Sequence, residues 1–270
     1  MADVLEVNKK LLEFYNTIEN KYNVWFLGLY GSQNYNLDTE TSDIDTKALI
    51  IPSFKDLTEN NGVVNNLILT PENEHIEVKD ARGMIHNFWK QNINFLEILF
   101  TRHVIVNKKY YEEWKALTEL REQIAHYDER TAANAMFGMA KQKQTFLCKS
   151  RPGNQEVVEK YGYDGKQLSN IMRLYNFLSN YTNDCSFDFC LTYHHPICSE
   201  KIIAAKRQEY SLETAINLAN ETMSLMEELK NNYLNKLNYY HTIPSNSLHQ
   251  KVNDIVYSVY EKAVREELNS

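Results

Sequence analysis

The sequence predicts an α+β protein, with a few strands among helices in the first hundred residues and helices alone in the remainder. Hydrophobic residues make up 43% of the 270 positions, enough for a substantial core, whereas only 8 Gly and 5 Pro are present. So few turn residues argue against an all-β fold, which needs them at short intervals. Short apolar runs typical of strands occur before about residue 92, and helical periodicity follows.

The elements are expected in the following order. Apolar residues spaced by three and four predict a helix over residues 4–18. The near-continuous apolar run 24–30 is typical of a buried strand, and further strands are expected over 42–51 and 75–79. Helical spacing then recurs over 81–91, 95–100, 109–124, 129–149, 164–181, 211–237 and 248–268, with loop-like breaks at 150–154, 181–198 and 241–247.

Composition and charge exclude several classes of protein. No apolar run approaches the roughly 18 to 20 residues that cross a bilayer, so we expect no membrane partner. Four cysteines are too few for a disulfide scaffold of this length, which favours reduced thiols and a cytoplasmic location. The formal net charge of -7 argues against a surface that coats nucleic acid, although it leaves room for a local basic groove.

The candidate catalytic motif is Asp43-Ile44-Asp45, eleven residues after Ser32. Side chains alternate across a strand, so both carboxylates are expected on one face, where they can bind the same divalent ions. Mg²⁺ or Mn²⁺ would bind these oxygens and substrate phosphates together. Gly31 and Ser32 can bring backbone N–H groups and a hydroxyl to a phosphate. Each motif alone is usually a solvated strand end or a loop, but together they indicate phosphoryl-transfer chemistry.

A third carboxylate is expected on the strand over 75–79. Glu77 has apolar neighbours and shares its face with His75 and Lys79, so we choose it as the catalytic acid. Asp80 and Glu74 are out of phase with that face. Asp80 directly precedes a helical pattern and is better explained as an N-cap.

This order of motifs resembles the nucleotidyltransferase superfamily to which DNA polymerase β belongs. Longer strings are similar to the RNA-ligase-associated, RNA-repair subfamily of polymerase-β-like nucleotidyltransferases. They are Gly31-Ser-Gln-Asn-Tyr-Asn-Leu37, Ser42-Asp-Ile-Asp45 with Lys47, Asn92-Ile-Asn-Phe-Leu-Glu-Ile-Leu99, Tyr163-Asp-Gly-Lys166 and Arg173-Leu174. The resemblance covers about residues 24–240. It departs from the subfamily at Asn36 (usually Gly), Lys47 (usually Arg), Ile93 (usually Pro) and Gln167-Leu168 (usually His-Ala).

The resemblance implies a small mixed-sheet catalytic domain over 1–105 and an all-helical domain over 106–270 that closes over the nucleotide. It implies a metal-dependent enzyme that moves a nucleoside monophosphate from a triphosphate such as ATP to an acceptor hydroxyl and releases pyrophosphate. The implied roles are Mg²⁺ (or Mn²⁺) binding by Asp43, Asp45 and Glu77, and nucleotide binding by Gly31, Ser32, Lys166 and Arg173. Glu77 would also help to deprotonate the acceptor.

The acceptor and the helical half leave alternatives open. Lys166 and Arg173 lie seven residues apart on one helical stripe, where they could hold a triphosphate or form a solvated face paired with Asp164 or Glu159. An RNA end, a protein hydroxyl and a small molecule all remain candidate acceptors. A non-catalytic nucleotide sensor and a toxin-like modifier of protein or tRNA are the alternative functions.

Two further clusters favour structural explanations. The basic residues Lys141, Lys143, Lys149 and Arg151 have few aromatic residues among them, so a solvated face is favoured over a polynucleotide site. Glu97 lies in an apolar stretch and is expected to form a structural ion pair. The Cys and His residues over 185–198 match no common zinc spacing.

Overall fold

The computed structural model describes residues 4–40, 42–70, 74–193, 196–239 and 246–269. The chain divides into two units, of which the first contains residues 1–34, 40–128 and 244–270 and the second contains 35–39 and 129–243. This division differs from the expected boundary at residue 105. It differs because the helices after residue 105 still pack on the sheet, and because the C-terminal helix returns to the first unit. No helix among the described residues has the length and apolar character needed to span a membrane.

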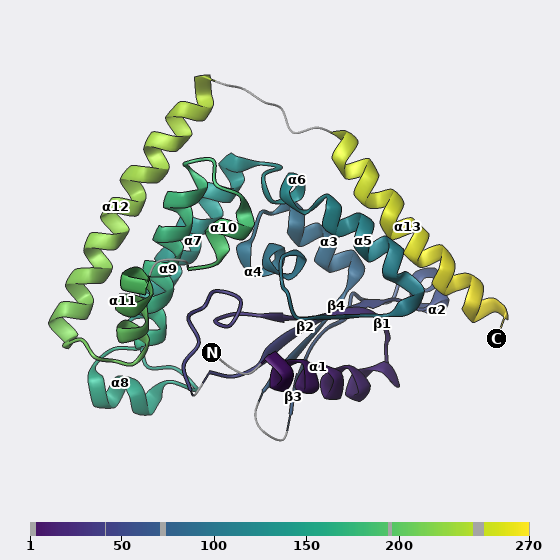
Figure 1. Ribbon diagram of the computed structural model, residues 1–270, viewed down its shortest axis with the longest axis horizontal. Coiled ribbons are helices and arrows are strands. Elements are labelled where there is room, and N and C mark those ends of the chain that lie inside the picture. The colour runs from purple at the N-terminus through teal and green to yellow at the C-terminus, as the bar shows by residue number, and fades with distance from the viewer. Residues whose placement is uncertain (1–3, 41, 71–73, 194–195, 240–245, 270) are drawn as a thin grey trace. The chain divides into compact units, whose positions relative to one another are not determined.

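The first unit combines a five-stranded mixed sheet with helices (Figure 1). Its elements are α1 (Val4–Glu19), β1 (Asn23–Tyr30), β2 (Asp45–Ile51), α2 (Phe54–Thr58), β3 (Asn65–Leu69), β4 (His75–Asp80), α3 (Ala81–Trp89), α4 (Ile93–Leu96), the 3₁₀ helix η1 (Glu97–Leu99), β5 (Val104–Val106), the 3₁₀ helix η2 (Lys108–Tyr110), α5 (Tyr111–Glu119), α6 (Arg121–Ala125) and α13 (Asn246–Asn269). The strand order is β3-β4-β2-β1-β5, with β2 and β4 parallel and the other pairs antiparallel.

The three expected strands are confirmed as β1, β2 and β4, and two more are present. β3 is an edge strand paired only with β4, and its Leu67 and Leu69 are 59% and 55% exposed. Its apolar run is only Leu67-Ile68-Leu69, which is too short to indicate a strand. β5 is only three residues long, and its pairing with β1 is a long-range contact that local sequence does not encode.

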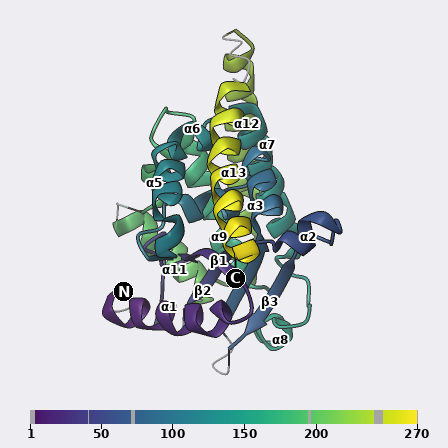
Figure 2. The ribbon, with the colours of Figure 1, turned by 90° about the vertical axis from the view of Figure 1, so that its right-hand side faces the viewer.

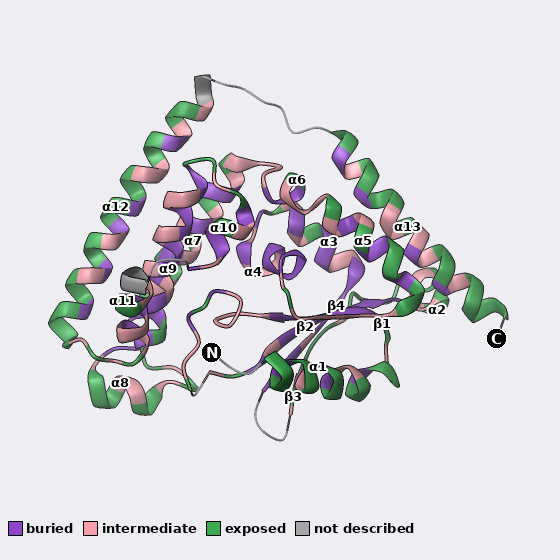
Figure 3. Ribbon diagram, viewed as in Figure 1, coloured by how far each residue is buried: buried purple, intermediate pink, exposed green. Residues whose placement is uncertain are grey.

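The two faces of the sheet have different partners. α1 covers one face with Val7, Leu11, Phe14 and Ile18, which pack in one core with alternate residues of β1, β2 and β4. Figure 3 shows these strands as largely buried. α3 and η1 pack on the sheet as well, and a Cβ on Gly28 would lie 2.7 Å from the Cδ1 of Ile98, which shows how closely η1 approaches β1.

The C-terminal helix α13 belongs to the first unit, where it lies beside α5 (Figure 2). Its Val252 and Val259 are fully buried. Glu113 of α5 accepts a hydrogen bond from Ser258 at 2.6 Å and forms an ion pair with Lys262 at 2.7 Å. Burial raises the pKa of Glu113, but the bonds from Lys262 and Ser258 outweigh it and hold that pKa below its usual value. The ionised carboxylate therefore stabilises the contact between α5 and α13.

Glu113→Gln is expected to lower the free energy of unfolding by about 1 to 2 kcal/mol at pH 7, the range for a hydrogen bond to a charged group. Because the folded-state pKa lies below the unfolded value of about 4.3, this contribution is fully present above that pH and is lost as the pH falls through the folded-state pKa. Denaturant unfolding at pH 7 and pH 3 measures the difference. Glu112→Gln, an exposed neighbour on the same helix, is the control. If Glu113→Gln lowers the free energy of unfolding as much at pH 3 as at pH 7, the ionic contribution of Glu113 is contradicted.

The second unit is helical throughout its regular structure in the described residues. It contains α7 (Glu129–Phe146), α8 (Gln155–Tyr161), α9 (Gly165–Tyr181), α10 (Phe187–Leu191), α11 (Pro196–Lys206) and α12 (Leu212–Tyr239). α9 is central and packs against α7, α10, α11 and α12. The helix α10 lies within a segment expected to be a loop; at five residues it is too short to show a periodic pattern.

Candidate active site

Asp45 is the first residue of β2, whereas Asp43 and Ile44 precede the strand, which was expected to begin at residue 42. Asp43 is exposed, Ile44 is buried and Asp45 is partly exposed. The strand that would align the two acids includes only Asp45, so their position on one face stays a prediction. Tyr30, the last residue of β1, pairs with Asp45, so the Gly31-Ser32 turn begins directly beside the acids.

Gly31 opens a tight turn at the end of β1. Its φ of +91° lies in the left-handed region, which glycine adopts without steric cost. Asn34 holds the turn by donating its backbone N–H to the Gly31 carbonyl at 3.0 Å and its side-chain amide to the Leu29 carbonyl at 3.0 Å. Gln33 donates to the Asp43 carbonyl at 3.4 Å and so links the turn to the acids. Residues 32–36 form turns, and no helix begins at the Gly-Ser pair.

His75 lies beside the second acid. Its Nδ1 is 2.9 Å from the Asp45 Oδ1. His75 and Glu77 alternate with buried Ile76 on β4, as expected for one face of a strand. The contact fixes the Asp45 carboxylate, whose second oxygen has no hydrogen-bond partner among the described residues.

Glu77 is held by two lysines. Its Oε2 lies 3.2 Å from the Lys47 Nζ, and its Oε1 lies 2.6 Å from the Lys79 Nζ. Burial raises the pKa of Glu77, but the two lysines outweigh it and keep that pKa below its usual value. The group is therefore an ionised carboxylate and a weak base.

Lys47 is the buried centre of this charge cluster. It is 3% exposed and faces Glu77 from the neighbouring strand, and its Nζ lies 3.0 Å from the centroid of the Tyr30 ring. Burial lowers the pKa of Lys47, whereas the charges of Glu97 and Glu77 oppose that shift. The interaction with Glu97, which is fully buried, agrees with the structural role expected for that acid.

The donor set fits a hard divalent ion in part. Asp43 and Asp45 present carboxylate oxygens of the kind that Mg²⁺ prefers. Among the described residues, however, no group of three or more His, Cys, Asp or Glu side chains is arranged to hold a metal. Glu77 would have to leave both lysines to become a ligand, and its role as the third acid stays a prediction.

The two alternatives to Glu77 have structural roles. Asp80 caps α3 by accepting from the Arg82 backbone N–H, and it also pairs with the Arg82 guanidinium, which confirms the expected N-cap. Glu74 is buried and pairs with Lys10.

In the second unit, α9 carries the two predicted triphosphate ligands. Lys166 is exposed, whereas Arg173 is only 6% exposed and stacks its guanidinium 4.2 Å from the centroid of the Tyr35 ring. Neither cation forms an ion pair with Asp164 or Glu159 in the described part of the chain. Arg173 is therefore not on a solvated face, whereas Lys166 is exposed to solvent, and the role of both cations stays a prediction.

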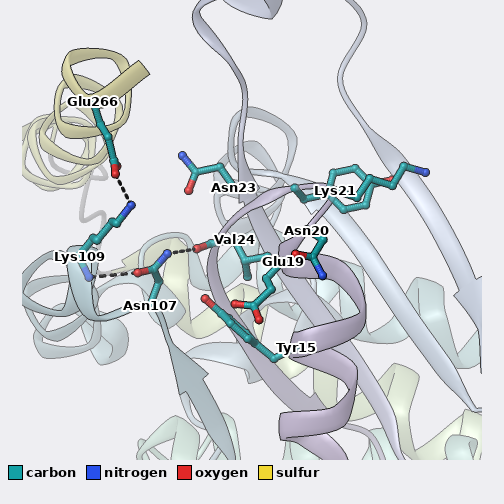
Figure 4. A pocket seen from close by; sticks show the side chains of 10 residues that line it. Tyr15, Glu19, Asn20, Lys21, Asn23, Val24, Asn107, Lys109 and Glu266 are labelled. Carbon is teal, nitrogen blue, oxygen red and sulfur yellow. Dashed lines mark hydrogen bonds and ion pairs between the residues drawn. The ribbon is translucent and has the colours of Figure 1, made fainter. Parts of the chain in front are cut away.

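A pocket of about 550 Å³ lies elsewhere in the first unit, at the start of β1 (Figure 4). Its lining includes Tyr15, Asn23 and the ion-paired Lys109 and Glu266. The acids lie beside the other end of β1, about 23 Å away at strand rise over seven residues. The pocket is thus separate from the candidate active site.

Sequence reasoning gave no role to two residues that the structure places at the acids, namely Lys47 and His75. Both stand two positions from a predicted acid on the same strand. Side chains alternate along a strand, so the same reasoning places Lys47 on the face of Asp45 in β2 and His75 on the face of Glu77 in β4. The cysteines Cys148, Cys185 and Cys190 form no disulfide among the described residues, and His194 and His195 lie outside those residues.

Comparison with known proteins gives similarity to solved structures but not to families or curated sequences. No family model and no curated protein matches the sequence. The crystal structure of a nucleotidyltransferase-like protein from Exiguobacterium sibiricum 255-15 is similar over 97% of this chain and 92% of that chain, at 12% sequence identity and a TM-score of 0.29. Similarity at that TM-score does not by itself establish a shared fold.

Proposed function

We propose that the protein is a metal-dependent nucleotidyltransferase that moves a nucleoside monophosphate from a triphosphate to an acceptor hydroxyl and releases pyrophosphate. The observation that carries the proposal is the position of Asp45 at the start of β2, paired with Tyr30 directly before the Gly31-Ser32 turn, with Asp43 two residues before it. Paired acids beside a phosphate-binding turn are what phosphoryl transfer requires.

The residues of the first unit divide the task between them. Asp43 and Asp45 would hold Mg²⁺ or Mn²⁺, which when bound neutralises charge on the phosphates and on the entering and leaving oxygens. Gly31 and Ser32 would bind phosphate through the backbone N–H and the hydroxyl. Glu77 would become the third acid, and would help to deprotonate the acceptor, once its pairs with Lys47 and Lys79 open.

The RNA-ligase-associated motifs make an RNA end the first acceptor to test, followed by protein hydroxyls and small molecules. Each of the four nucleoside triphosphates, labelled at the α-phosphate, is incubated with each acceptor class in the presence of Mg²⁺. Label that moves to an acceptor together with pyrophosphate release supports the proposal. If no triphosphate labels any acceptor class, the catalytic proposal is contradicted.

A non-catalytic nucleotide sensor is the second candidate. The observation that favours it is the engagement of both Glu77 oxygens by lysines, which leaves the acids without a third ligand in this state. A sensor would bind nucleotide without needing the metal.

Metal dependence of nucleotide affinity separates the two functions. Mg²⁺ is expected to raise the affinity for a nucleoside triphosphate by about tenfold or more, because the ion bridges carboxylate and phosphate oxygens. Calorimetric titration with Mg²⁺ and with a chelator gives the two affinities. Equal affinities would favour the sensor.

A further inference from the structure

Four cations gather in the second unit around the beginning of α9. Lys143 lies on α7, Arg151 in the loop between α7 and α8, and Lys166 and Arg173 on α9. α7 packs directly against α9. Burial lowers the pKa of Lys143, and the charges of Arg151, Arg173 and Lys166 lower it further. The other three positive charges therefore all act on Lys143.

The loop that carries Arg151 is tied to the start of α9. The Arg151 backbone N–H donates to the Asn154 Oδ1 at 2.7 Å, and the Asn154 Nδ2 donates to the Asp164 Oδ2 at 3.1 Å. Asp164 caps α9, and its backbone N–H donates to the Leu147 carbonyl at 2.8 Å, at the end of α7. These bonds hold the cations together in the absence of any ligand.

No acidic side chain neutralises the cluster. In the part of the chain that the structure describes, none of the four cations forms an ion pair within 4.0 Å. Asp164, whose charge acts on Lys143, accepts instead from the Lys166 backbone N–H and from the side-chain amides of Asn154 and Gln167. The carboxylate is thus used in capping, and the positive charge remains in excess.

Arg173 is the strongest evidence for a ligand. Its side chain is 94% removed from solvent, yet its Nε and Nη1 have no hydrogen-bond partner, and the Nε of Arg151 is also buried without one. Stacking on Tyr35 attracts the charge but leaves these N–H groups unsatisfied. Buried donors without partners are costly, and an anion is the group that would satisfy them.

We propose that Lys143, Arg151, Lys166 and Arg173 form a binding site for a chain of phosphates, the triphosphate of the nucleotide. Lys166 and Arg173 are separated by about 10.5 Å along α9, which favours an elongated anion over a single phosphate. The inference deepens the proposed function, on which it rests for the identity of the nucleotide. It gives Lys143 and Arg151, which the sequence favours as a solvated face, a direct role in binding.

The test is calorimetric titration of the full chain with inorganic tripolyphosphate in the absence of metal. Lys143→Gln and Arg151→Gln are each expected to weaken binding by about tenfold, the effect of losing one charge-assisted hydrogen bond. Both residues are partly exposed, so these variants are expected to fold, and circular dichroism checks this. Lys141→Gln removes an equal charge from an exposed position on α7 and should bind as the wild type does.

Arg173→Gln should weaken tripolyphosphate binding more than inorganic phosphate binding, with Arg173→Lys recovering part of the loss. The site is overturned if the wild type does not bind tripolyphosphate, if Lys143→Gln binds as tightly as Lys141→Gln, or if the variants lose affinity for single-stranded RNA but not for tripolyphosphate. Because this binding needs neither the acids nor transfer, it can succeed where the proposed function fails. If the wild type transfers label but the variants bind tripolyphosphate as tightly as the wild type, the proposed function stands and this site is overturned.

Discussion

Replacing Asp43 with alanine is expected to reduce nucleotidyl transfer by about a thousandfold or more, since a catalytic metal supplies several kcal/mol of transition-state stabilisation. Asp45→Ala should have a similar effect on the rate. The measured quantity is the initial rate of label transfer at saturating Mg²⁺. A variant of either residue that retains a near wild-type rate would contradict the metal assignment.

The two variants should differ in stability. Asp43 is exposed, so its removal relieves repulsion between two acids and should leave the melting temperature without metal unchanged or slightly higher. Asp45 contacts the His75 ring, and its loss removes that contact as well. Asp254→Ala, which removes an exposed acid from α13, is the control for a general charge effect and should transfer normally.

Replacing Lys47 with methionine is expected to destabilise the protein by about 3 to 5 kcal/mol, the cost of leaving buried charge without its partner. Lys47 is 3% exposed and lies between two acids, Glu77 and Glu97, so its removal leaves both carboxylates without this counter-charge. Denaturant unfolding at pH 7 gives the change in free energy.

The double variant Lys47→Met with Glu77→Gln should recover part of that loss, because one of the two acids is then neutral. Lys55→Met, which removes an exposed lysine with a long ion pair to Glu59, should change the stability by less than about 0.5 kcal/mol. If Lys47→Met lowers the free energy of unfolding no more than Lys55→Met does, the stability of the buried charge cluster does not depend on Lys47.

Local patterns of the sequence determined the strands that carry the acids. The apolar runs before Gly31 and before Pro52 depend only on neighbouring residues, and β1 and β2 form there. Asp80 caps α3 for the same local reason. Asn36, which stands where the subfamily that the motifs resemble has Gly, has a φ of 58°, as expected of a residue that tolerates the left-handed region.

Tertiary structure decided which charges are buried and what they meet. Lys166 and Arg173 share a helical stripe in the sequence, but only Arg173 is buried, because Tyr35 comes to it from a segment far away in the chain. The ion pair between Glu77 and Lys47 requires the parallel pairing of β2 with β4. The contact between α13 and α5 joins segments more than a hundred residues apart in the sequence. The periodicity of the sequence predicts which residues share a face of a helix or strand. Whether those residues are buried or form ion pairs depends on the distant segments that pack against that face.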